Sequence, residues 1–180
     1  MRKTIIFLSS IGLQSYSLSR LSRECDLILV VDQLEISNLT HDIKQYFQEV
    51  IISSAGTYCG PIIKLDLDKT IALLQPELAS YDANNVYIVN TSEANTLIAA
   101  QLRQQLKISG LTPGDAVLFT DKSRMKRAVA EKGIRTPKSC VLSADYGHLS
   151  QALGQAFIVK PVDAAGSYGV ELIHTQGNLY

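Results

Sequence analysis

Four continuous apolar runs, separated by stretches with helical periodicity, most constrain how this chain can fold. The runs cover residues 4–8, 26–31, 50–52 and 86–89. Helices are expected between them, at residues 16–24, 42–48 and 66–78. Apolar strands without polar alternation are typical of a parallel sheet that helices cover on both faces. The chain therefore predicts an α/β fold that begins with a parallel sheet.

A further helix is expected to begin at Glu93, directly after the fourth strand. Its buried stripe would comprise Leu97, Ile98, Leu102 and Leu106. Pro113 and Gly114 are interpreted as the end of this helix, because they interrupt regular structure. We place a domain boundary there, which divides the 180 residues into a first domain at 1–114 and a second at 115–180.

A dinucleotide-binding unit is the rival interpretation of the first domain. Gly12 follows the first strand, and Asp32 ends the second, in the place where an acidic residue would hold a ribose. However, the segment from Ile11 to Tyr16 contains one glycine instead of three, so the close approach of backbone to pyrophosphate is not provided for. Gly12 is interpreted as an ordinary turn residue and Asp32 as a strand-end residue.

The second domain opens with a well-marked helix. Asp121 is a good N-cap, Met125, Ala128 and Val129 form an apolar stripe, and Gly133 is a good terminator. Lys122 lies in the first turn, where the helix dipole disfavours a cation unless an anion binds nearby. Residues 133–137 then form a turn that leads into an expected strand at 139–142, and a second helix is expected at 145–154.

An apolar strand at residues 157–159 ends in Lys160 and Pro161, and a glycine-bracketed turn follows at 166–169. A lysine at a strand end can hold its ammonium over an anion, and the glycines let backbone N–H groups approach phosphate oxygens. The alternative is a β-hairpin whose lysine is merely solvated.

Taken together, these motifs resemble the ATP-grasp superfamily, most closely the carboxylate–amine ligases, including amino-acid ligases. The resemblance rests on Glu93, on Asp121-Lys122, and on residues 133–137, 158–161 and 166–170, which occur in the family's order. It covers residues 93 to about 173. It implies a Rossmann-like pre-ATP-grasp domain followed by the first, incomplete α+β subdomain of an ATP-grasp fold.

The resemblance also implies an activity: ATP phosphorylates a carboxylate, and an amine then attacks the acyl phosphate. Lys160 would contact the α and β phosphates, and Lys122 would approach them from the other side. Gly166, Ser167, Tyr168 and Gly169 would close over the β and γ phosphates, and Glu93 would contact substrate. ATP and Mg²⁺ are the implied cofactors. Asp163-Ala164-Ala165 departs from the family, which often has another glycine there.

The acidic and Asn ligands that hold Mg²⁺ in the family lie beyond the position that corresponds to Tyr180. We therefore expect that this truncated chain does not complete catalysis alone and needs a second polypeptide or a missing C-terminal half. No catalytic residue is assigned. The alternative is a non-catalytic α/β module that serves binding or assembly.

The composition of the chain limits the classes of partner that we expect it to bind. The formal charge is zero, and Lys122, Arg124, Lys126 and Arg127 form only a local basic helix face, which is usually solvated. A nucleic-acid partner is not expected. No apolar stretch reaches the roughly twenty residues of a membrane span, so we expect a cytoplasmic protein that does not bind membranes.

The cysteines and histidines do not indicate a metal site. Cys25, Cys59 and Cys140 are widely spaced and lie in or beside apolar segments, and the three histidines are isolated from them. Reduced, buried thiols are therefore expected.

Overall fold

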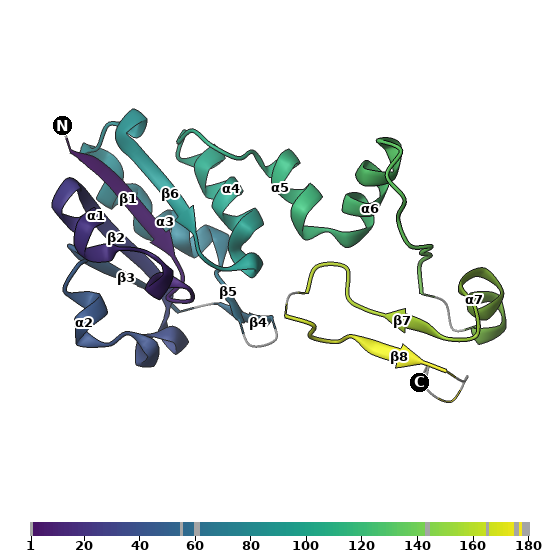
Figure 1. The fold of residues 1–180 in the computed structure, drawn as a ribbon. Coiled ribbons are helices and arrows are strands. Elements are labelled where there is room, and N and C mark those ends of the chain that lie inside the picture. Colours follow the sequence, from purple (N-terminus) through teal and green to yellow (C-terminus); the bar gives the residue numbers. More distant parts are fainter. Residues whose placement is uncertain are drawn as a thin grey trace.

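The computed structural model describes residues 2–54, 56–59, 62–142, 145–164, 166–174 and 177. The N-terminal part forms an α/β body, and the chain then passes through two helices to a small α+β unit (Figure 1). Among the described residues, no helix is both long enough and apolar enough to span a membrane.

The four predicted strands form one parallel sheet. They are β1 (Lys3–Leu8), β2 (Cys25–Asp32), β3 (Glu49–Ser53) and β6 (Val86–Asn90). Their order is β3-β2-β1-β6, with β1 paired to both β2 and β6. The predicted α/β class and parallel topology are confirmed.

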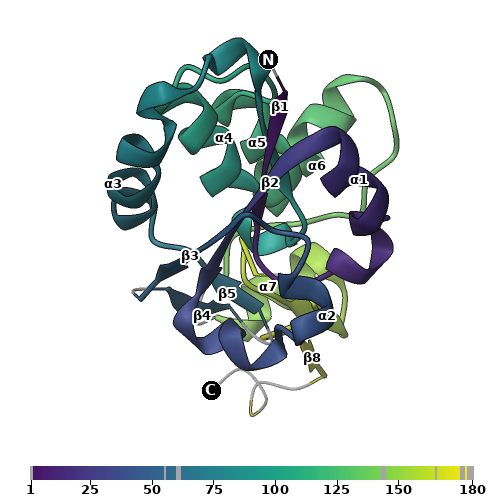
Figure 2. The ribbon, with the colours of Figure 1, turned by 90° about the vertical axis from the view of Figure 1, so that its left-hand side faces the viewer.

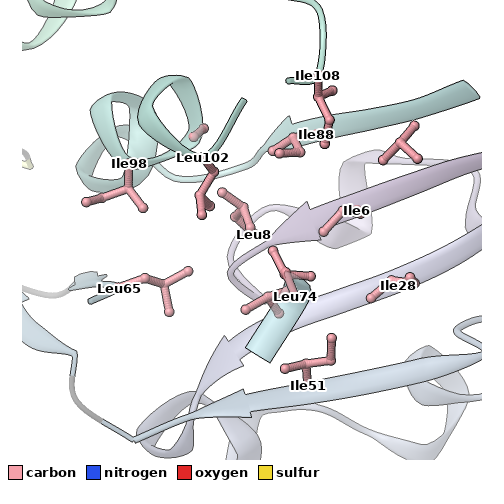
Figure 3. Close-up of a cluster of buried hydrophobic side chains, with 13 residues drawn as sticks. Ile6, Leu8, Ile28, Ile51, Leu65, Leu74, Ile88, Ile98, Leu102 and Ile108 are labelled. Carbon is pink, nitrogen blue, oxygen red and sulfur yellow. The ribbon is translucent and has the colours of Figure 1, made fainter. Parts of the chain in front are cut away.

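Both faces of this sheet are covered, as the continuous apolar runs required (Figure 2). On one face, Ile6, Leu8, Ile28 and Val30 pack against α3 (Leu67–Glu77) and α4 (Thr96–Gln105), and Figure 3 shows this cluster. On the other face, Phe7, Leu27, Leu29 and Val31 form a second cluster beside α1 (Leu18–Glu24) and α2 (His41–Lys44). Successive strand residues point to opposite faces, so each apolar run serves both clusters.

Several short elements connect the strands and helices. The 3-10 helices are η1 (Leu13–Ser15), η2 (Gln33–Asn38), η3 (Leu78–Ser80), η4 (Ala83–Asn85) and η5 (Glu93–Asn95). A hairpin of β4 (Thr57–Cys59) and β5 (Ile62–Lys64) follows β3 and was not predicted. The helix expected from Glu93 begins with η5 and continues as α4, whose Ile98 and Leu102 are buried while Leu97 and Leu106 are half-buried.

Pro113 begins a helix, which corrects the prediction that it ends one. It occupies the first turn of α5 (Pro113–Thr120), and the Thr112 hydroxyl caps this helix by accepting a hydrogen bond from the Asp115 N–H at 3.2 Å. Proline suits this position because its missing N–H would have had no partner in the helix. Helix α5 packs against both α4 and α6 (Lys122–Glu131) and so joins the two parts of the chain.

The C-terminal unit places one helix on one face of a two-stranded hairpin. It comprises α7 (Tyr146–Leu153), β7 (Phe157–Val159) and β8 (Glu171–Ile173), with the strands antiparallel. Leu149, Phe157 and Ile173 form its buried core. The Tyr146 hydroxyl lies 2.7 Å from the Gln155 carbonyl and 2.9 Å from that of His174, so it joins the helix to both strand ends.

Two expectations fail in the segment that leads to this unit. Residues 139–142 were expected to form a strand, but they lie outside any strand and Val141 is 90% exposed. Within the described residues no neighbouring strand pairs with this segment, and an apolar run alone cannot supply the ladder hydrogen bonds. Cys140 is exposed rather than buried for the same reason, whereas Cys25 is half-buried. The side chain of Cys59 lies outside the described residues.

Candidate functional site

A groove of about 460 Å³ lies between α6, residues 138–142, α7 and β7. Its floor is apolar and includes Leu149, Leu153, Phe157 and Val159. Four lysines line it: Lys122, Lys126, Lys138 and Lys160. No Asp or Glu is among the described residues that line the groove. An apolar floor with several cations suits an anion that carries a flat or apolar group.

Lys160 lies where the sequence predicts, directly after β7. Its side chain is exposed and lines the groove, and it takes part in no ion pair or hydrogen bond within the part of the chain that the structure describes. The alternative of a hairpin with a solvated lysine is partly realised, because β7 and β8 do form a hairpin. The position of Lys160 on the groove wall distinguishes it from an isolated surface lysine.

Lys122 also lines the groove, but its ammonium is engaged. Asp121 caps α6 by accepting hydrogen bonds from the Ser123 and Arg124 N–H groups at 2.8 and 2.9 Å. The Lys122 ammonium donates to the carbonyl of Ala164 and, at 3.4 Å, to that of Val162. Its backbone N–H also donates to Val162, at 3.1 Å. These contacts join the start of α6 to the loop that precedes the glycine turn.

The glycine turn is built by left-handed backbone. Gly166, Ser167 and Gly169 have φ values of 64°, 61° and 66°, and the Val170 N–H donates to the Ser167 carbonyl at 3.3 Å. A Cβ on Gly169 would lie 2.8 Å from Pro161 Cγ, so the turn folds closely onto the residue that follows Lys160. Gly166, Ser167, Tyr168 and Gly169 are exposed and do not line the groove. The structure thus brings Lys122 and Lys160 to one groove and leaves the turn beside it.

Glu93 lies elsewhere. It is exposed in η5, just past the carboxyl end of β6, and does not line the groove.

Asp32, also in the N-terminal α/β body, is 2% exposed, and its carboxylate accepts hydrogen bonds from the Leu34 and Gly56 N–H groups at 3.0 and 2.8 Å. Asp32 therefore stabilises backbone, in agreement with its interpretation as a strand-end residue rather than a ribose ligand.

Sequence reasoning missed Lys126 and Lys138 as members of the groove. Lys126 was assigned to a solvated helix face, and Lys138 carried no motif. A usable signal was present for Lys126, because it follows Lys122 by four residues and so lies on the same side of α6. No such signal exists for Lys138, whose place depends on how residues 134–142 pass α6.

The described residues contain no group of three or more His, Cys, Asp or Glu side chains that could hold a metal ion.

Comparison with known proteins places this fold. No family model matches the chain. One curated relative, a D-alanine–D-alanine ligase from Rhizorhabdus wittichii, is 25% identical over 119 residues, which are 65% of this chain and 38% of the relative. Among solved structures, N5-carboxyaminoimidazole synthetase from Staphylococcus aureus in complex with ADP matches 99% of this chain and 44% of its own, with a TM-score of 0.67 and 16% identity.

A second solved structure is the biotin carboxylase domain of the Hydrogenobacter thermophilus 2-oxoglutarate carboxylase, in complex with MgADP, ADP and bicarbonate. It matches 99% of this chain and 39% of its own, with a TM-score of 0.63 and 15% identity. The chain has the fold of the N-terminal part of an ATP-grasp ligase. It spans about two fifths of the length of these proteins, and the resemblance to ATP-grasp carboxylate–amine ligases that the motifs predicted is confirmed.

Proposed function

We propose that this chain contributes an ATP-binding surface to an ATP-grasp ligase that joins a carboxylate to an amine. One observation carries the proposal: Lys122 and Lys160, 38 positions apart in the sequence, line a single groove with an apolar floor. Two of the solved structures with this fold are complexes with ADP. A curated relative that is 25% identical over 119 residues is a D-alanine–D-alanine ligase, which supports the carboxylate–amine class.

In this proposal the apolar floor holds the base, and the cationic wall holds the phosphates. Lys160 donates to phosphate oxygens from its place directly after β7, whose last residue, Val159, pairs with Glu171 of β8. The exposed turn of Gly166, Ser167, Tyr168 and Gly169 closes over the terminal phosphate with backbone N–H donors. Fixed donors of this kind stabilise negative charge without reorganising during the reaction.

The proposed reaction has two steps. The γ-phosphoryl group of ATP passes to a carboxylate oxygen, which releases ADP and forms an acyl phosphate. An amine then forms a bond to the acyl carbon, and inorganic phosphate leaves while the amine gives up a proton. Glu93, at the carboxyl edge of the parallel sheet, is the proposed contact for the carboxylate or amine substrate, since this edge is where α/β sheets bind ligands.

Magnesium is proposed to enter with the nucleotide. The described residues do not gather the carboxylates that would hold it, so no step of the reaction is assigned to the metal through this part of the chain. We propose that the metal ligands and the remaining catalytic groups come from residues outside these 180, either in the same polypeptide or in a partner. We also propose that the enzyme is cytoplasmic and that its first domain comprises residues 1–114.

Calorimetric titration of the 180-residue chain with ATP and Mg²⁺ tests the proposal. We expect saturable heat that is lost in Lys160→Gln. Lys132→Gln is the matched control, because Lys132 is exposed at the end of α6 and does not line the groove. Absence of saturable heat in the unmodified chain would refute the proposed nucleotide site.

A non-catalytic role in assembly is the second candidate. It is favoured by two apolar side chains that the structure leaves exposed on the C-terminal unit and that pair across its strands, Ile158 at 61% and Leu172 at 56%. Exposed apolar surface of this kind marks an interaction face when it is contiguous. A chain that binds no nucleotide but self-associates through this face would support this candidate.

A further inference from the structure

The groove carries more positive charge than the two predicted phosphate ligands supply. Besides Lys122 and Lys160, it is lined by Lys126 and Lys138. Neither Lys126 nor Lys138 forms an ion pair or hydrogen bond within the described part of the chain, and the described residues that line the groove include no carboxylate. Four cations thus share one concave surface without a counter-charge on the wall.

Helix α6 makes this cluster of positive charges unfavourable in free energy when no anion is bound. Lys122 lies in its first turn, where the positive end of the helix dipole repels a cation, and Asp121 only caps two N–H groups and pairs with Arg124 at 3.6 Å. Lys126 follows four residues later, so the two ammonium groups belong to a like-charge pair of the kind that destabilises a helix. Half-burial of Lys126 removes part of the solvent that would screen this repulsion.

The engagement of Lys122 changes which lysines are available to a ligand. Its ammonium donates to two carbonyls, those of Val162 and Ala164, so a phosphate would have to compete with both. Lys126, Lys138 and Lys160 have no such partner in the described part of the chain. The unpaired cations therefore stand on three different elements: α6, the extended segment after Pro137, and the end of β7.

We propose that Lys126 and Lys138 are further phosphate-binding residues, and that together with Lys160 they make the groove selective for a polyphosphate over a monophosphate. This inference rests on the proposed nucleotide site and specifies its ligand. A triphosphate carries more negative charge than a monoester and spreads it along a chain, so three cations that line one groove gain more from the triphosphate. Binding of such a ligand also relieves the repulsion between the lysines.

The test compares three probes by calorimetric titration with Mg²⁺ present: ATP, AMP and inorganic triphosphate. Lys126→Gln and Lys138→Gln are each expected to lower the affinity for ATP and for triphosphate about tenfold, which corresponds to one lost charge-assisted hydrogen bond. The affinity for AMP is expected to change by less than about twofold, because its single phosphate would bind beside Lys160. Lys126→Arg, which keeps the charge, should retain most of the ATP affinity.

Matched controls are Lys132→Gln for the helix and Arg135→Gln for the segment that joins α6 to α7, since both residues are exposed and neither lines the groove. They should bind ATP like the unmodified chain. ATP affinity that stays within about twofold in Lys126→Gln and Lys138→Gln, while Lys160→Gln loses binding, would overturn this inference and leave the nucleotide site intact. Loss of equal size for AMP and ATP would also overturn it. No ATP binding by the unmodified chain would overturn the site itself.

Discussion

Gly169 is the residue on which the shape of the turn between β7 and β8 depends most. Its φ is 66°, and an added Cβ would lie 2.8 Å from Pro161 Cγ and 3.1 Å from Cδ. Both the backbone conformation and the close contact therefore favour glycine. Gly133, at the end of α6, has a similar φ of 76° but nothing within 4 Å of an added Cβ. Alanine substitutions at the two positions therefore separate the free-energy cost of the left-handed backbone conformation from the cost of the steric contact with Pro161.

We predict that Gly169→Ala destabilises the chain more than Gly133→Ala. The left-handed conformation costs about 1–2 kcal/mol for alanine at either site. The contact with Pro161 adds about 1–3 kcal/mol at Gly169, as overpacking does. Urea unfolding gives the total for each variant, and hydrogen exchange of the β7 and β8 amides locates the loss. Equal losses in the two variants would mean that the Pro161 ring moves aside without cost.

Elements with a strong local signal were predictable from the sequence, and elements that depend on distant partners were not. The buried strands and the helices capped by Asp66, Asp121 and Asp145 appear where they were expected, because apolar burial and capping act within a few residues. The strand at 139–142 failed because a strand needs a neighbour, which no local pattern supplies. Helix α5 was missed because Pro113 was interpreted as a stop instead of a first-turn residue.

The residues of the candidate site also differ in whether the sequence could predict them. Lys122 and Lys160 could be predicted because each stands in a motif with a fixed place on a helix or strand. Lys138 could not, because its local sequence pattern does not distinguish a lysine on a groove wall from a solvated one. For Lys126 the only signal was its spacing of four residues from Lys122, which puts both on the same side of α6. The engagement of Lys122 with the carbonyls of Val162 and Ala164 was also beyond prediction, since these residues lie 40 and 42 positions away.

Strand β3 and helix α3 meet through two carboxylates, Glu49 and Glu77. Partial burial and the negative charge and hydrogen bond of Glu77 raise the pKa of Glu49 above its ordinary value of 4.5. A carboxyl that ionises less readily in the folded chain than in the unfolded chain favours folding only while it is protonated. Stability is therefore greatest below the ordinary pKa and is lost as pH rises through the raised pKa of the folded protein.

We predict that Glu49→Gln stabilises the protein at pH 7, by about 1 kcal/mol or less because solvent screens the pair. The gain should disappear at about pH 3.5, where Glu49 is protonated in both the folded and the unfolded chain. Calorimetric melting at several pH values measures the difference between the two proteins. Glu131→Gln, exposed on α6, is the control and should show no such dependence. A gain that stays constant across this pH range would rule out the carboxylate pair as its cause.

On the scale of the whole molecule, the two parts of the chain differ in how many faces of their sheets carry a buried apolar cluster. The parallel sheet has a buried cluster on each face. The β7–β8 hairpin has a buried cluster on one face only, formed with α7. On its other face, Ile158 and Leu172 are directly paired across the strands and are 61% and 56% exposed, and Ile158 also lines the groove. Two adjacent apolar side chains on an uncovered sheet face favour association with another apolar surface.

We predict that the 180-residue chain self-associates through this face. Full burial of a Leu or Ile side chain contributes about 1.5–3 kcal/mol, so Ile158→Thr combined with Leu172→Thr should weaken association at least about tenfold. Threonine is β-branched and suits a strand at both positions, so the hairpin itself should persist. Sedimentation velocity over a range of concentrations measures the effect. Leu34→Thr removes a side chain of 51% exposure from η2 in the other part of the chain and is the matched control. If the double variant and the control associate equally, the hairpin face is not the contact, and the assembly role proposed for it loses its support.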